Sequence, residues 1–180
     1  MLNHRLQKSI FPRKVLMHSR KLALPLASAY VLMLLFLGAF AGIDSAAQSS
    51  VGTWRLDLSK SSFTNTTAPK FEQLVVNTDE ADYIKWNLSG VMPDGKSYIE
   101  SYDGPIDGKS HKVVSINGSS VIAYTRTSTG LQWVMKDAKG NVVETGAGQV
   151  TPDANTLVLK GTITTSTGRA RFTAVFNRAQ

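Results

Sequence analysis

The 180-residue chain contains no cysteine, and its only histidines are His4, His18 and His111. Without cysteine there is no disulfide framework, no thiolate metal site and no cysteine nucleophile. Two of the three histidines fall within residues 1–47, a basic and apolar segment that differs in composition from the rest of the chain. We therefore expect no metal site in the remainder of the chain.

The chain also lacks a basic cluster outside its N-terminal segment, although its formal net charge is +7. Residues 1–47 carry six basic side chains and one acidic side chain, whereas residues 48–180 carry 14 basic and 12 acidic ones. Nucleic-acid binding requires basic side chains gathered on one face or along one helix. We therefore expect no nucleic acid among the partners.

Residues 1–47 have the three parts of a secretory signal peptide. Six basic residues precede Leu22, the stretch 26–43 carries no charge, and the small residues Ser45-Ala46-Ala47 follow. This order is typical of a signal that is cleaved, here after Ala47, with Ala39-Phe40-Ala41 as a second candidate site. The basic part, about 21 residues, is long for a signal, so a start at Met17 is an alternative. An uncleaved anchor is the alternative, because a bilayer span needs only about 20 apolar residues. Both interpretations place the rest of the chain in the periplasm or outside the cell, with membrane contact only through this segment.

Residues 48–180 show no sustained helical spacing of apolar residues, and short alternating runs recur instead. Alternation with period two indicates half-buried strands. Turn sequences such as Pro93-Asp94-Gly95 separate the runs. The predicted strands cover residues 51–58, 71–77, 83–88, 96–102, 112–116, 120–128, 131–137, 141–151, 156–165 and 169–178.

This series predicts an all-β domain over residues 48–180, folded as an antiparallel up-and-down barrel of about 8–10 strands. An open sheet would leave two unpaired edges, and closure removes them. A sandwich is the alternative, but its Greek-key crossings need longer connections than most of those found here. The one long connection, residues 59–70, is expected to form a lid or a crossing over the barrel mouth.

Closure brings the two ends of the domain together. The end of strand 169–178 would lie beside the start of strand 51–58, and Arg178 shares the parity of the apolar residue Phe176. We predict that the Arg178 guanidinium stacks on the Trp54 indole, a contact that contributes about 0.5–2 kcal/mol. Gly52, Trp54 and Arg178 are thus the predicted barrel-closing residues. A frayed terminal Arg178 is the alternative.

The opening strand also carries a family resemblance. Gly52-Thr53-Trp54 matches the Gly-x-Trp signature of lipocalins and the wider calycin group, and Lys60-Ser61-Ser62-Phe63 and Pro69-Lys70 follow it. Over residues 51–180 the chain resembles small bacterial exported lipocalin-like proteins, whose functions are mostly unassigned. The C-terminal helix of typical lipocalins is missing from the sequence pattern. The resemblance implies an exported barrel that carries a small ligand.

The candidate ligand-binding residues are Trp86, Tyr124, Arg126 and Trp133. A ligand cavity is mainly apolar with a few convergent polar groups, and here Arg126 would bind a carboxylate. An ordinary packed core with an outward arginine is the alternative. We expect a barrel that binds a small apolar or amphipathic molecule in a cavity of about 300 Å3 or more. A filled barrel that binds partners through its surface is the second hypothesis.

Residue patterns that could support catalysis are few. Ser110, His111 and Asp107 would make a nucleophile with its base, but adjacent residues of a strand point to opposite faces. Glu100 and Glu144 are the one carboxylate pair worth weighing for glycoside hydrolysis, and we expect both on exposed strand faces. We therefore expect no catalytic residue, no cofactor and no enzymatic activity.

Overall fold

The computed structural model describes residues 47–115 and 120–180 of the chain. The predicted signal segment lies outside the described residues, apart from Ala47. Every regular element in the described part is a strand, and no helix there has the length and apolar character to cross a membrane. The strands are β1 (Gly52–Leu56), β2 (Ser62–Thr64), β3 (Phe71–Asp79), β4 (Tyr83–Val91), β5 (Ser97–Pro105), β6 (His111–Ser115), β7 (Ser120–Arg126), β8 (Leu131–Asp137), β9 (Val142–Val150), β10 (Thr156–Thr165) and β11 (Gly168–Arg178).

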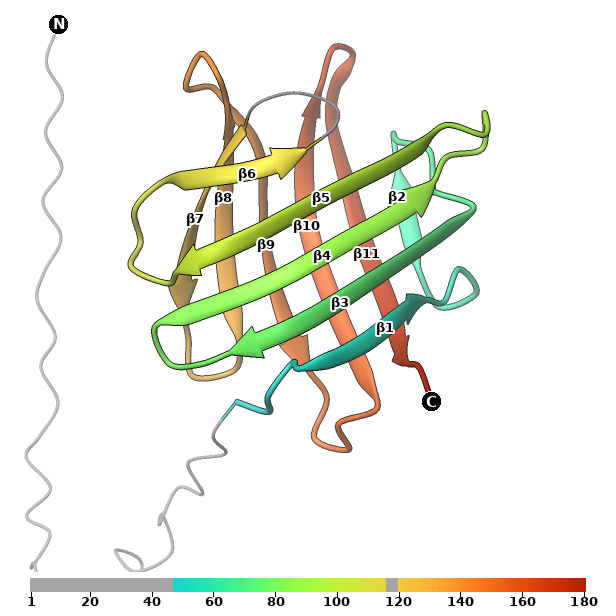
Figure 1. The fold of residues 1–180 in the computed structure, drawn as a ribbon. Coiled ribbons are helices and arrows are strands. Elements are labelled where there is room, and N and C mark those ends of the chain that lie inside the picture. The colour runs from blue at the N-terminus through green and yellow to red at the C-terminus, as the bar shows by residue number, and fades with distance from the viewer. Residues whose placement is uncertain (1–46, 116–119) are drawn as a thin grey trace, which may run out of the picture. The chain divides into compact units, whose positions relative to one another are not determined.

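The strands form one closed antiparallel barrel, which confirms the predicted fold class (Figure 1). From β3 to β11 each strand pairs with the next in the chain, and β1 pairs with both β3 and β11. Trp54 lies opposite Arg178, and Leu56 lies opposite Phe176. The first strand therefore closes the ring against the last, as the unpaired edges of an open sheet would favour.

Residues 59–70 do not form the expected lid. Part of this segment is β2, which pairs with β11 and places Phe63 opposite Phe172. The turn before β2 is also bound to β11, because the Val175 amide donates to Ser61 Oγ at 2.9 Å and the Asp57 amide donates to the Val175 carbonyl at 2.7 Å. The segment thus covers the part of the β11 edge that β1 leaves unpaired, so that β1 and β2 share one position in the barrel.

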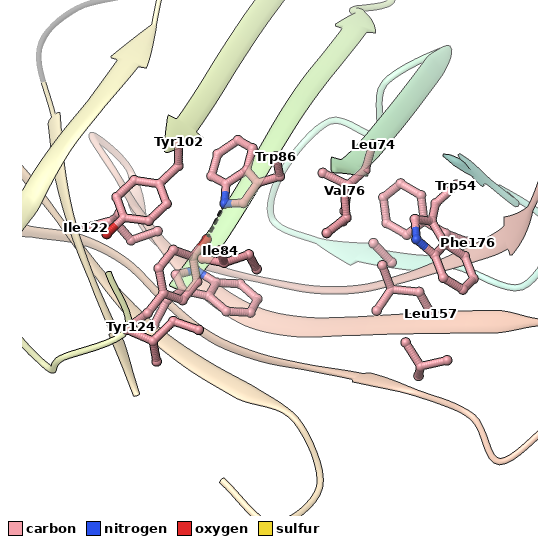
Figure 2. Packing of buried hydrophobic residues seen from close by; sticks show 14 of the residues in the cluster. Trp54, Leu74, Val76, Ile84, Trp86, Tyr102, Ile122, Tyr124, Leu157 and Phe176 are labelled. Carbon is pink, nitrogen blue, oxygen red and sulfur yellow. Dashed lines mark hydrogen bonds between the residues drawn. The ribbon is translucent and has the colours of Figure 1, made fainter. Parts of the chain in front are cut away.

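The barrel is flattened into two layers with the core between them. In Figure 1, β1 and β3–β6 form the nearer layer, and β7–β11 run behind them at a steep angle. Figure 2 shows Trp54, Leu157 and Phe176 gathered in one part of the core and an aromatic group in the other. The buried side chains are Trp54, Leu74, Val76, Ile84, Trp86, Tyr102, Ile106, Val113, Ile122, Tyr124, Trp133, Val150, Leu157, Ala170, Ala174 and Phe176.

Aspartates set the geometry of four connections. The carboxylate at the start of each turn accepts a hydrogen bond from the backbone N–H two residues later, which is the local bond that makes Asp a turn former. These bonds measure 2.9–3.1 Å and join Asp94 to Lys96, Asp107 to Lys109, Asp137 to Lys139, and Asp153 to Asn155. Such short turns keep successive strands adjacent, which is why the barrel has up-and-down order.

One end of the barrel is closed by Arg178 and Trp54. The Arg178 Cζ atom lies 4.2 Å from the centroid of the fully buried Trp54 ring. Arg178 also donates to the Ala154 carbonyl through Nε and to the Val51 carbonyl through Nη1, both at 2.7 Å. Gly52, with φ of 144°, leaves room for the guanidinium, because a Cβ atom there would lie 2.3 Å from Nη1. The three predicted barrel-closing residues therefore lie together.

Candidate functional site

A cavity of about 170 Å3 lies inside the barrel, and Trp86, Tyr124, Arg126 and Trp133 all line it. Its volume is similar to the roughly 150 Å3 of an engineered apolar cavity that binds benzene. The expected volume of about 300 Å3 or more was wrong. Large side chains from both layers, two tryptophans among them, point inward and occupy much of the interior. The apolar part of the lining comprises Leu74, Val76, Ile84, Trp86, Leu88, Ile122, Tyr124, Leu131, Trp133, Met135, Val150, Leu157 and Leu159.

Trp86, Tyr102 and Tyr124 contact one another through one hydrogen bond and two ring–ring contacts (Figure 2). Trp86 Nε1 donates to the Tyr124 hydroxyl at 2.9 Å. The Tyr102 ring lies 5.2 Å from the Tyr124 ring and 6.4 Å from the Trp86 ring, between centroids. The Tyr102 hydroxyl donates to the Pro105 carbonyl at 2.7 Å. Because the polar atoms of Trp86 and Tyr124 bond to each other, these two rings present mainly carbon surface to the cavity, which Tyr102 does not line.

The Trp133 indole can lie against strand β9 because the residue opposite it there is a glycine. Trp133 lies opposite Gly146, and a Cβ atom at Gly146 would come within 2.2 Å of the indole ring. Gly148, the next inward residue of β9, has the Leu159 side chain 2.6 Å from its own Cβ position. Interior glycine in a strand often marks such a close approach. Both glycines stand in the sequence, but only the cross-strand register identifies Trp133 and Leu159 as the side chains that lie against them.

Glu100 and Glu144 also line the cavity, so the expectation that both lie on exposed strand faces was wrong. Glu100 shares its strand face with Tyr102, which is 2% exposed, and that buried ring turns the whole face inward. Alternation gave the shared parity of Tyr98, Glu100 and Tyr102 but not the side of the sheet on which they lie.

The carboxyl groups inside the barrel are protonated more readily than ordinary glutamates. Burial raises the pKa of Glu144 to about 7, against an opposing hydrogen bond of 2.8 Å from Trp133 Nε1, and the charges of Glu100 and Glu72 raise it further. Burial also raises the pKa of Glu100, against a bond from Ser115 Oγ at 3.3 Å. The pKa of Glu72, to which the Tyr98 hydroxyl donates, is raised by burial as well. In the described part of the chain none of the three forms an ion pair with a lysine or arginine.

Arg126 already binds a carboxylate of its own chain. Its Nη2 atom lies 2.6 Å from Asp79 Oδ1, and the Asp79 side chain is only 4% exposed. Asp79 also accepts bonds from the Ser50 amide at 2.8 Å and the Ser50 hydroxyl at 2.7 Å, while Arg126 donates to the Glu80 carbonyl. The Nε atom of Arg126 is buried and has no partner among the described residues. The predicted cation thus lines the cavity, but its charge is balanced by Asp79.

Of the residues considered for catalysis, Glu100 and Glu144 both line the cavity, whereas Ser110, His111 and Asp107 are not arranged as a nucleophile with its base. His111 Nε2 lies 2.9 Å from Asp107 Oδ1 at the surface, and the described residues show no hydrogen bond between this ring and the exposed Ser110. Nor do residues 47–115 and 120–180 bring together three His, Asp or Glu side chains in an arrangement that could hold a metal ion.

The comparisons with known proteins give fold likeness only. No protein-family model and no curated protein matches the sequence. The zebrafish ileal bile acid-binding protein complexed with cholic acid is 10% identical, with a TM-score of 0.47 over 72% of this chain and 98% of that one. A redesigned β-barrel is 17% identical, with a TM-score of 0.42 over 72% of this chain and 91% of the other. Both scores are low, so the architecture described above rests on this chain's own strand pairing.

Proposed function

We propose that this protein is a non-catalytic barrel that binds one small apolar or amphipathic molecule in its interior cavity. The observation that carries the proposal is the 170 Å3 of open space among the inward side chains. Protein interiors are close-packed, with few voids larger than a water molecule. Side chains that border a space of this size lose van der Waals contacts that close packing would give them. A filled barrel that acts only through its surface would have no reason to retain it.

The proposal includes export of the domain and its likeness to lipocalin-like proteins. Export is supported by the charge and apolar pattern of residues 1–47. The likeness is supported by the Gly52-Thr53-Trp54 motif at the start of the first strand, where Trp54 is fully buried at the barrel closure. Sequencing the N-terminus of the protein recovered from a secreting host tests cleavage after Ala47. A start at Met1 or Met17 would contradict it.

Binding of small neutral molecules tests the cavity directly. Trp86 and Trp133 line the cavity, so toluene or 2-phenylethanol is expected to change tryptophan fluorescence saturably. Leu88→Phe adds a ring inside the cavity, whereas Ile99→Phe adds the same ring at a position that is 53% exposed. We expect Leu88→Phe to lose binding and Ile99→Phe to keep it. Failure of the unaltered protein to bind any small neutral molecule would refute the proposed function.

A further inference from the structure

The charges that face the cavity are unbalanced. The side chains of its lining that can carry a charge are Asp79, Glu100, Arg126 and Glu144. Arg126 and Asp79 form an ion pair at 2.6 Å, which leaves the two glutamates without a cation in the described residues. They come from β5 and β9, and the charge of Glu100 acts on Glu144. The cavity is therefore an apolar space with two unpaired carboxyl groups on its wall.

These carboxyl groups have unused hydrogen-bonding capacity. In the described part, Glu144 accepts one bond, from Trp133, and Glu100 accepts one, from Ser115. An ionised carboxylate offers about four acceptor sites. Because a buried charge without a partner is strongly unfavourable, each group must take a proton or meet a cation. A protonated amine supplies both a positive charge and up to three N–H donors.

The rest of the lining suits the remainder of such a molecule. Trp86, Tyr124 and Trp133 border the same space, and aromatic faces attract cations as well as apolar groups. The volume of 170 Å3 restricts the ligand to one small ring or a short chain. A fatty-acid or bile-acid anion would be too large, and its carboxylate would meet Glu100 and Glu144.

We propose that the cavity binds a small amine as its cation, with the ammonium group at Glu144 and Glu100 and the apolar body against Trp86 and Trp133. This inference rests on the proposed function, because it identifies the ligand class of the same cavity. It predicts that, among molecules of one size, an amine binds most tightly, a neutral alcohol less tightly and a carboxylate least tightly.

Three matched probes test the order: phenethylamine, 2-phenylethanol and phenylacetate, titrated by calorimetry into the unaltered protein at pH 8. Charge-assisted hydrogen bonds are stronger than neutral ones, so we expect the amine to bind about tenfold more tightly than the alcohol. Glu144→Gln should remove this advantage without changing the affinity for the alcohol. Glu80→Gln alters an exposed glutamate outside the cavity lining and should change neither affinity.

A second measurement needs no variant. Lowering the pH from 8 to 5.5 protonates Glu144, while the amine keeps its charge, so amine affinity should fall and alcohol affinity should stay constant. The groups that face Glu144 are Glu100, Glu72, Tyr124 and Trp133. Equal affinities for amine and alcohol at pH 8, or tighter binding of phenylacetate to the unpaired Arg126 Nε, would overturn the amine inference and leave the proposed function standing. Absence of binding by all three probes and by toluene would overturn both.

Discussion

The indole of Trp133 donates a hydrogen bond of 2.8 Å to the Glu144 carboxylate inside the barrel. An apolar ring and an acid thus share one wall of the cavity, on neighbouring strands β8 and β9. The bond orients the carboxylate, and the glycine at 146 gives the ring its space. This pair combines the two properties that define the site, which are a carbon surface and an unpaired acid.

The first prediction concerns pH and stability. The pKa of Glu144 is raised from 4.5 to about 7 in the folded protein, so between these values the folded state binds more protons than the unfolded state. The free energy of unfolding should therefore fall as the pH rises through this window. Glu144→Gln removes the effect and should raise stability at pH 8 by up to about 3 kcal/mol, at 1.36 kcal/mol for each pKa unit. Urea unfolding at pH 4.5 and pH 8 measures it, and an equal difference between variant and unaltered protein at both pH values would contradict it.

The second prediction concerns the glycine beside Trp133. Gly146→Ala places a methyl group 2.2 Å from the indole, so the ring must move into the cavity or β9 must shift. Overpacking of this kind costs about 1–3 kcal/mol, and binding of 2-phenylethanol should weaken with it. Ala147→Gly changes the exposed neighbour on the same strand and serves as the control for binding. Unchanged affinity in Gly146→Ala would show that Trp133 does not shape the site.

The third prediction concerns the Asp79 ion pair. Asp79→Ala leaves Arg126 without its carboxylate and Ser50 without its acceptor. Removing one partner of a fully buried pair costs about 3–5 kcal/mol. Asp79 is 4% exposed but Arg126 is 28% exposed, so the loss should lie toward the lower end of this range. Lys96→Met breaks an ion pair whose side chains are 83% and 51% exposed but keeps the turn bond to Asp94, and it should change stability little. Thermal unfolding of both variants compares the two pairs, and similar losses would contradict the ranking.

The fourth prediction concerns barrel closure. Arg178→Met removes the guanidinium from the Trp54 ring and its donors from the carbonyls of Val51 and Ala154. We expect a loss of about 2–4 kcal/mol, from the cation–π contact together with hydrogen bonds to a charged group. Arg169→Met, at the exposed start of the same strand, should change stability by no more than about 0.5 kcal/mol. Chemical denaturation measures both variants, and equal stabilities would mean that Arg178 does not hold the closure.

Much of the fold could be predicted because its signals are local. The expected strands 131–137 and 156–165 match β8 and β10, and aspartate turns such as the one at Asp94 keep neighbouring strands adjacent. The Trp54–Arg178 pairing also followed, since a closed up-and-down barrel must join its first strand to its last. The segment 59–70 was misjudged because three residues of alternation are too few to indicate a strand. Its pairing depends on the edge of β11 that remains free.

The sequence by itself determined the strands other than β2, their antiparallel order and the face that each side chain shares with its neighbours along the strand. The tertiary structure alone decided that Glu100 and Glu144 face inward, that Asp79 takes the charge of Arg126, and that about 170 Å3 stays open between them. The physical reason is the distance along the chain over which each kind of interaction acts. Alternation and turn chemistry act over a few residues, whereas a cavity is what remains after side chains from strands far apart in the chain have filled one shared interior.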